Sequence, residues 1–160
     1  MKQTYRYREQ QRTEPVVIAL FAIPILLEAY LSYQSVIEWH IRQVAYIHLF
    51  CAALFVLVAG IFNRFTVLVT DTEIVFGFGV FRKRISLDDI HATSLAEASF
   101  RTTGIGIHIV SGGYWAWVAR TGPALRLTVG NNMAGGYILS SSRPRDLAAA
   151  IARTPLTPDE

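Results

Sequence analysis

Two long apolar stretches, at 16–36 and 44–62, dominate the first third of the chain. The first contains one charged residue, Glu28, and the second contains no Asp, Glu, Lys or Arg but includes His48. A helix needs about 20 mostly apolar residues to cross the hydrocarbon core of a bilayer. The seven residues between the stretches suffice for a tight turn. The pattern therefore predicts a transmembrane helical hairpin over 16–62.

After the hairpin, apolar and polar positions alternate in short runs separated by turn residues such as Gly112 and Gly113. This pattern is typical of an all-β sandwich or barrel. The predicted strands cover 64–70, 73–79, 80–87, 90–96, 105–110, 114–119, 125–129 and 137–140. An alanine-rich segment at 143–153 follows, with Ser142 as a possible cap and Pro144 in its first turn, and this predicts one C-terminal helix.

The expected fold class is thus an α+β membrane protein, in which the hairpin is followed by a mostly antiparallel β-barrel or sandwich with one C-terminal helix. The β domain with its helix spans 63–153, and a short polar tail follows at 154–160. Residues 1–15 are polar and contain too few apolar groups to pack by themselves, so we expect them to form a separate cytoplasmic segment.

Composition agrees with membrane anchoring, because charged residues make up 17% of the chain against about 25% in soluble domains. The net charge of +3 is mild and spread along the sequence, which argues against a nucleic-acid-binding surface. The single cysteine, Cys51, excludes an intramolecular disulfide. The first apolar stretch is longer than the roughly 7–15-residue core of a signal peptide, so we interpret it as an uncleaved anchor.

Basic residues flank the hairpin on its two outer sides, whereas the connecting turn offers only Arg42. Because positive charge favours the cytoplasmic side, both termini are expected in the cytoplasm, next to the cell membrane. The alternative is the reversed topology. Aromatic residues that favour the headgroup layer cluster around the turn and would mark the outer interface: Tyr30, Tyr33, Trp39 and Tyr46.

Glu28 is the most unusual residue of the two spans, since a carboxylate inside a bilayer is costly and is normally paired or functional. If the turn is centred near Trp39 and His40, Glu28 lies level with about Cys51, and His48 is about 4.5 Å away along the helix axis. A Glu28–His48 hydrogen bond or ion pair is therefore feasible. Three roles remain open: a bond that holds the hairpin together, a contact with another subunit, or part of a proton or ion pathway.

The chain resembles the bacterial pleckstrin-homology-like membrane proteins over roughly residues 50–153. The resemblance rests on residues 68–74 (LVTDTEI), on 79–90 (GVFRKRISLDDI), on the glycine pair at 104 and 106, and on the closing-helix residues Pro144, Leu147 and Ile151. It implies a pleckstrin-homology-like β domain and a non-enzymatic scaffold, with no catalytic residues and no general ligand to carry over.

Catalytic and cofactor motifs are not found in the sequence. The pairs Gly77/Gly79 and Gly104/Gly106 lack the third glycine of a nucleotide-binding loop. No metal-ligand spacing surrounds the histidines of the predicted strands. We therefore expect no enzyme activity, no cofactor and no metal.

Two surface hypotheses remain. The basic residues Arg64, Arg82, Lys83 and Arg84 are candidates for contact with anionic lipid headgroups, and the alternative is an ordinary solvated strand edge guarded by charge. The aromatic residues Trp115 and Trp117 share one face of a predicted strand and are candidates for a protein interface, and the alternative is that they fill the core.

The sequence thus favours a membrane-anchored scaffold, an accessory or assembly subunit whose partner is an integral membrane protein complex. The alternative is a lipid-sensing module that contacts membrane lipids through its basic residues. No nucleic-acid partner is expected.

Overall fold

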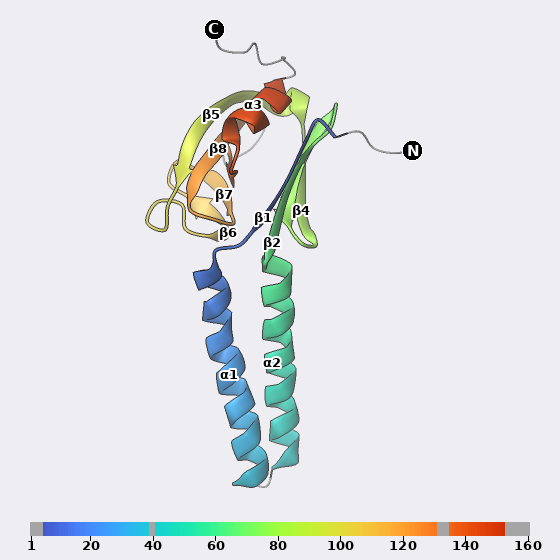
Figure 1. Ribbon diagram of the computed structural model, residues 1–160, viewed down its shortest axis with the longest axis vertical. Helices are drawn as coiled ribbons and strands as arrows, with labels where there is room; N and C mark the ends of the chain where they lie inside the picture. Colours follow the sequence, from blue (N-terminus) through green and yellow to red (C-terminus); the bar gives the residue numbers. More distant parts are fainter. Residues whose placement is uncertain (1–4, 39–40, 131–134, 153–160) are drawn as a thin grey trace. The chain divides into compact units, whose positions relative to one another are not determined.

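The computed structural model describes residues 5–38, 41–130 and 135–152 and divides the chain into two compact units (Figure 1). The hairpin unit comprises Thr13–Asn63, and the β unit comprises Met1–Arg12 together with Arg64–Glu160. The α+β class expected from the sequence is confirmed.

The hairpin unit consists of α1 (Pro15–Ile37) and α2 (Arg42–Phe62), which agree with the predicted apolar stretches to within two residues at each end. Both helices have the length and composition of membrane-spanning segments, with mean hydropathies of 2.0 and 2.4. Pro15 occupies the first turn of α1, where its missing N–H is not needed. The expected turn centre, Trp39 and His40, lies outside the described residues, as does the tail at 154–160.

Small side chains form the contact between α1 and α2. Ser32, Ser35 and Ala45 are buried, and the Ser32 hydroxyl donates to the Ala45 carbonyl at 3.3 Å. The Ser35 hydroxyl donates within its own helix, to the Leu31 carbonyl at 2.7 Å. Small residues let helix backbones approach closely, as they do between membrane helices.

The β unit contains two sheets and one helix (Figure 1). The first sheet has the order β1-β2-β3-β4 and is antiparallel throughout, with β1 (Tyr7–Arg12), β2 (Arg64–Val69), β3 (Glu73–Phe78) and β4 (Phe81–Ser86). A short 3₁₀ turn, η1 (Leu87–Asp89), leads to the second sheet. That sheet has the order β5-β8-β9-β7-β6, with β5 (Ile90–Ala98), β6 (Gly106–Val110), β7 (Tyr114–Val118), β8 (Gly122–Val129) and β9 (Gly136–Ser140). The pair β7–β9 is parallel, and α3 (Pro144–Ala152) ends the described chain.

The N-terminal segment differs from the sequence prediction, because residues 7–12 form β1 instead of a separate polar segment. Tyr7 lies opposite Val69 and Arg12 lies opposite Arg64. The inward-facing residues of β1 include Glu9 and Gln11, so the usual alternation of apolar and polar residues is missing from its sequence. The hairpin is consequently an insertion between two neighbouring strands of one β unit.

The eight strands predicted after the hairpin are present, and two of them are longer than predicted by two residues or more. The fourth extends to Ala98 and the seventh begins at Gly122, where the two strands pair with each other. Pro123 is tolerated in this extension because it stands near the first residue of β8.

Aromatic and aliphatic side chains of both sheets form the core of the β unit. Phe76 of β3 packs edge-on against Trp117 of β7 at 5.3 Å and against Tyr137 of β9 at 5.4 Å between ring centroids. From α3, Leu147 and Ile151 are buried, in the positions expected for a closing helix. These contacts hold the two sheets and the helix as one unit.

Candidate functional site

The Glu28–His48 pair expected from the sequence is present between α1 and α2. His48 Nδ1 lies 2.6 Å from Glu28 Oε2, and about one fifth of each side chain is exposed. Glu28 therefore has a polar partner within the hairpin, and this interaction offsets the cost of placing a carboxylate among apolar side chains. The nearby hydroxyls of Ser32 and Ser35 donate to backbone carbonyls, so they do not extend the pair into a chain of side-chain hydrogen bonds.

The basic residues that are candidates for lipid contact lie at exposed positions of the β unit, and three of them follow one another along β4. The register places Arg82 opposite Gly77 and Arg84 opposite Val75, whereas Lys83 lies opposite Phe76 on the other face. The strand β4 is an edge of its sheet. Exposed charges along an edge strand also discourage pairing with other chains.

Two of these basic residues have contacts within the β unit. The Arg82 Nε–H donates to the Gly79 carbonyl at 3.0 Å, and Arg84 lies 3.7 Å from the Glu73 carboxylate. The Arg84 side chain is 74% exposed, so this ion pair contributes little to stability.

The structure also brings Arg12 to Arg64, which the sequence alone did not indicate. The Gly79 N–H donates to the Arg64 carbonyl at 3.3 Å, so the β3–β4 turn lies beside these arginines. We call this part of the β unit the junction end, defined by Arg12, Arg64 and residues 79–81, because both connections to the hairpin leave from it. Recognising it from the sequence would have required the identification of β1.

Trp115 and Trp117 lie on the same side of β7, as predicted, and both are half-buried. Trp117 packs against Phe76 of the other sheet, which agrees with the core alternative for this residue. Its buried Nε1 has no hydrogen-bond partner among the described residues.

A buried polar cluster that sequence reasoning missed connects β1 to the segment between β9 and α3. Five donors converge on the two oxygens of Glu9. Oε1 accepts from Gln11 Nε2 at 2.8 Å and from the Ser142 N–H and hydroxyl at 2.7 and 2.6 Å. Oε2 accepts from the Ser141 hydroxyl at 2.6 Å and from the Tyr7 hydroxyl.

Hydrogen bonding sets the ionisation of this cluster. Burial alone would raise the pKa of the Glu9 carboxyl, but the bonds from Ser141, Ser142 and Tyr7 outweigh burial and lower the pKa. Burial, together with the bond to Glu9, raises the pKa of Tyr7 to about 12. The cluster therefore holds a carboxylate and a neutral phenol, an arrangement suited to joining strands.

The start of α3 strengthens the same connection. The guanidinium of Arg143 lies over the Tyr7 ring at 5.2 Å, and its Nη2 donates to the Arg8 carbonyl at 3.5 Å. The carboxylate of Glu9 receives the Ser142 N–H just before the first turn of α3, where negative charge is favoured. Together these contacts tie β1 to the C-terminal part of the β unit.

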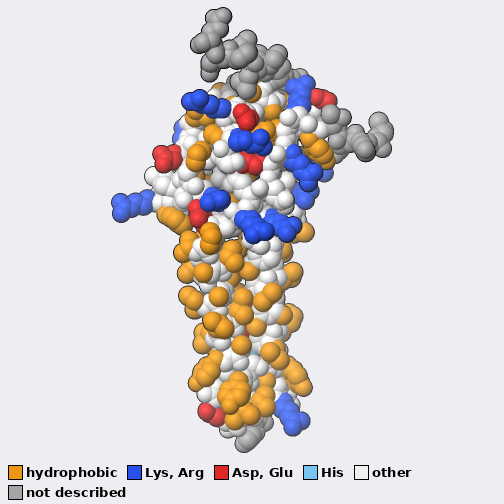
Figure 2. Space-filling model, in the orientation of Figure 1, with side chains coloured by type: hydrophobic (Ala, Val, Ile, Leu, Met, Phe, Trp, Pro, Cys, Tyr) orange, Lys and Arg blue, Asp and Glu red, His pale blue; other side chains and the backbone are white. Residues whose placement is uncertain are grey.

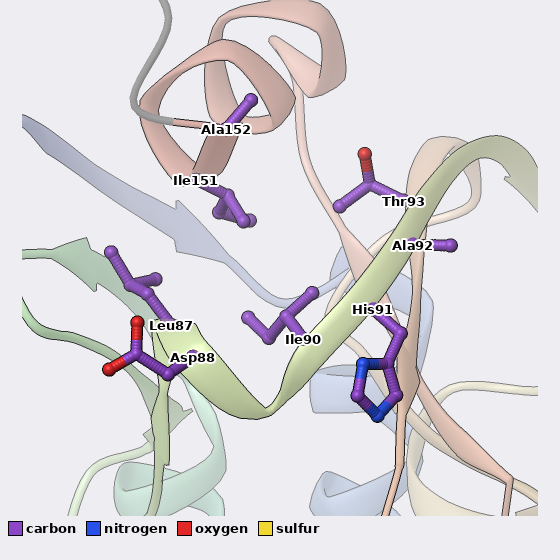
Figure 3. A pocket seen from close by; sticks show the side chains of 8 residues that line it. All are labelled: Leu87, Asp88, Ile90, His91, Ala92, Thr93, Ile151 and Ala152. Carbon is purple, nitrogen blue, oxygen red and sulfur yellow. The ribbon is translucent and has the colours of Figure 1, made fainter.

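A cavity of about 370 Å³ lies between η1, the start of β5 and the end of α3 (Figure 3). Leu87, Ile90 and Ile151 point towards its middle, whereas the His91 ring points away from α3. His91 lies against Gly130, where a Cβ added to the glycine would overlap the imidazole ring. Asp88 belongs to the 3₁₀ turn, and its backbone N–H donates to the Ser86 hydroxyl at 3.3 Å, a bond that stabilises the turn.

Two further cavities open on the β unit. One of about 420 Å³ is lined by residues that include Arg12, Arg120 and Ser140–Ser142. The other, of about 540 Å³, is lined by residues that include Glu97, Arg101 and Arg126. Within residues 5–38, 41–130 and 135–152, no three His, Cys, Asp or Glu side chains are grouped so as to hold a metal ion.

Comparisons of the chain with protein-family models, curated proteins and solved structures found no match.

Proposed function

We propose that the protein is a membrane-anchored scaffold without catalytic activity, an accessory or assembly subunit of a larger membrane protein complex. In this proposal α1 and α2 cross the cell membrane, and both termini lie in the cytoplasm. The β unit is a pleckstrin-homology-like domain of the kind found in the bacterial family that the sequence resembles. Its two sheets and closing helix support that assignment at the level of architecture.

The apolar outer surface of the hairpin is the observation that carries the proposal. Only 6% of the most apolar window of each helix is buried within the chain. Hydrophobic side chains cover the visible face of the hairpin, whereas charged side chains gather on the β unit (Figure 2). Such a surface is compatible with lipid tails and with the helices of another membrane protein.

One stripe on α2 is well suited to contact with a partner helix. Its members are spaced three or four residues apart and are 50% to 70% exposed: Tyr46, Phe50, Leu54 and Leu57. Residues at this spacing share one face of a helix.

Pairing of β1 with β2 supports the proposed topology. The strand β1 ends just before α1, and β2 begins just after α2, so both ends of the hairpin must open on the same side. The Glu28–His48 pair supports a structural role for the polar groups of the spans, because each provides the other with a partner inside the hairpin.

The test is affinity purification of the full chain in a mild detergent, followed by mass spectrometry. We expect a stoichiometric integral membrane partner, and we expect Phe50→Ala combined with Leu54→Ala to weaken its retention. Leu20→Ala combined with Ile23→Ala on α1 is the matched control for lost apolar surface. A chain that purifies alone, or with lipid only, would contradict the proposal.

A lipid-sensing module is the second candidate, and the exposed arginines of the junction end favour it. Arg12 and Arg64 lie opposite each other, with the β3–β4 turn beside them. This candidate predicts that the full chain contacts anionic headgroups in a salt-sensitive way.

A further inference from the structure

We propose that the β3–β4 turn rests in the headgroup layer of an anionic membrane, with Val80 and Phe81 inserted between the lipids. This inference rests on the proposed insertion of the hairpin into the membrane. In addition to the lipid contact through basic residues, it proposes that two apolar side chains enter the membrane.

The exposure of Val80 and Phe81 is not explained by packing of the core. Val80 is 76% exposed and Phe81 is 51% exposed. The other phenylalanines of this sheet, Phe65, Phe76 and Phe78, are at most 1% exposed. Tight turns are normally built from Gly, Pro, Asn, Asp or Ser, so an adjacent pair of exposed apolar residues in and beside a two-residue turn requires a reason.

Two glycines shape this turn. Gly79 has a φ of 51°, in the left-handed region that glycine adopts readily. At Gly77 a Cβ would lie 2.0 Å from the Phe81 carbonyl oxygen, so only glycine lets β4 approach β3 this closely. The Arg82 side chain donates back to the Gly79 carbonyl at 3.0 Å. The turn is therefore formed in advance, and presenting Val80 and Phe81 to a membrane requires no rearrangement.

Chain length keeps this turn close to the membrane, whatever the angle between the two units. Arg64 follows the last residue of α2 by two positions, and Arg12 precedes the first residue of α1 by three. At no more than about 3.6 Å per residue, these links span at most about 7 Å and 11 Å. The Gly79 N–H is bonded to the Arg64 carbonyl. The headgroup layer is roughly 5–8 Å thick on each side of a bilayer, so the shorter link keeps Arg64 within reach of this layer, and the turn lies beside Arg64.

Charge around the turn matches an anionic surface. Arg12, Arg64 and Arg82 are exposed at or next to the junction end, and Glu14 offsets part of their charge. Each basic residue close to an anionic membrane strengthens binding about five-fold. Apolar side chains that enter the interface beside such charges add to the attraction.

The experiment measures the depth of the turn in the full chain by spin labelling. In a Cys51→Ala background, one variant carries a nitroxide at Val80→Cys. The matched control carries it at Thr72→Cys, in the exposed turn at the opposite end of β2, which lies about 20 Å away along a strand of this length. Both are reconstituted into vesicles of phosphatidylcholine, with or without phosphatidylglycerol.

We expect the label at position 80 to be accessible to oxygen and shielded from a water-soluble relaxation agent, and to be more strongly shielded than the label at position 72. Phosphatidylglycerol should increase the shielding at position 80. Equal exposure to water at positions 80 and 72 in the anionic vesicles would overturn the proposal, and equal depth in both kinds of vesicle would overturn its anionic part.

A third label, at Leu54→Cys in α2, separates this inference from the proposed insertion of the hairpin. A lipid-exposed label at position 54 with a water-exposed label at position 80 rejects the inference alone. A water-exposed label at position 54 rejects insertion of the hairpin, and the inference with it.

Discussion

Replacement of Glu9 by alanine should destabilise the β unit more than any other single change in β1. The substitution removes the acceptor for five donors, which come from Tyr7, Gln11, Ser141 and Ser142. Glu9 is 6% exposed, so water cannot simply take the place of the carboxylate. Buried donors that lose their acceptor carry the full cost of desolvation.

The loss of stability in Glu9→Ala depends on which hydrogen-bond partners remain for the donors that contacted Glu9. A hydrogen bond to a charged group contributes roughly 1.5–3 kcal/mol, so five independent bonds would sum to about 7 kcal/mol or more. They are not independent, because the hydroxyls of Tyr7 and Ser141 lie 3.2 Å apart and Gln11 also donates to the Ser140 carbonyl at 3.1 Å. Ser142 is exposed and can bond to water. We therefore expect Glu9→Ala to cost about 3 kcal/mol.

Glu9→Gln should cost much less, about 1 kcal/mol, because the amide oxygen still accepts from Ser142 and the amide NH₂ can donate to the hydroxyls of Tyr7 and Ser141. For a unit of about 100 residues, 1 kcal/mol corresponds to roughly 4–8 °C in Tm. Thermal unfolding of the full chain in detergent, followed by tryptophan fluorescence, to which Trp115 and Trp117 of the β unit contribute together with Trp39, measures both variants. Glu97→Ala in β5, an exposed position, is the control for loss of a glutamate.

The same cluster predicts a dependence on pH. Because the folded state lowers the pKa of Glu9, its stabilisation is present above the pKa of an unfolded glutamate and disappears as the pH falls through the lowered value. The difference in Tm between the wild type and Glu9→Ala should therefore shrink in acid. At the alkaline end, the raised pKa of Tyr7 predicts a loss of stability between pH 10 and about 12 that Tyr7→Phe does not show. Equal Tm values for the wild type and Glu9→Ala at neutral pH would refute the reasoning.

Three further substitutions test other parts of the structure. Gly77→Ala places a Cβ 2.0 Å from the Phe81 carbonyl oxygen, so we expect a loss of at least about 2 kcal/mol in thermal unfolding, and an unchanged Tm would show that β4 moves freely. Trp117→Ala should cost about 3–5 kcal/mol and Trp117→Phe clearly less, and equal losses would count against a packing role. His48→Ala leaves the Glu28 carboxylate without its partner. We expect the free energy of unfolding of the hairpin, measured by titration with dodecyl sulfate, to fall by about 1–3 kcal/mol. The added change Glu28→Leu should reverse this loss.

The helices and most strands could be predicted from the sequence because their signals are local. The two hairpin helices are long apolar runs, and the strands after Arg64 are short runs of alternating apolar and polar residues between turns rich in glycine. The Glu28–His48 pair could also be predicted, since a short turn fixes the register of two antiparallel helices. Each of these inferences requires only the spacing of residues along the chain.

The strand β1 and the cluster around Glu9 could not be predicted in this way. The inward face of β1 contains Glu9 and Gln11, which become buried only because Ser140, Ser141 and Ser142, far along the chain, satisfy their hydrogen bonds. A polar residue that is buried by a distant partner has the same local pattern as an exposed one. The junction end depends on β1, so it was missed for the same reason.

Whether the hairpin crosses a bilayer is tested most directly by the accessibility of single cysteines in sealed membrane vesicles of known orientation. In a Cys51→Ala background, Gln43→Cys at the start of α2 and Thr72→Cys in the β unit are treated with a membrane-impermeant maleimide. If the hairpin spans the membrane, the two positions react from opposite sides, with Thr72→Cys on the cytoplasmic side. Reaction of both positions from the same side would contradict a membrane-spanning hairpin.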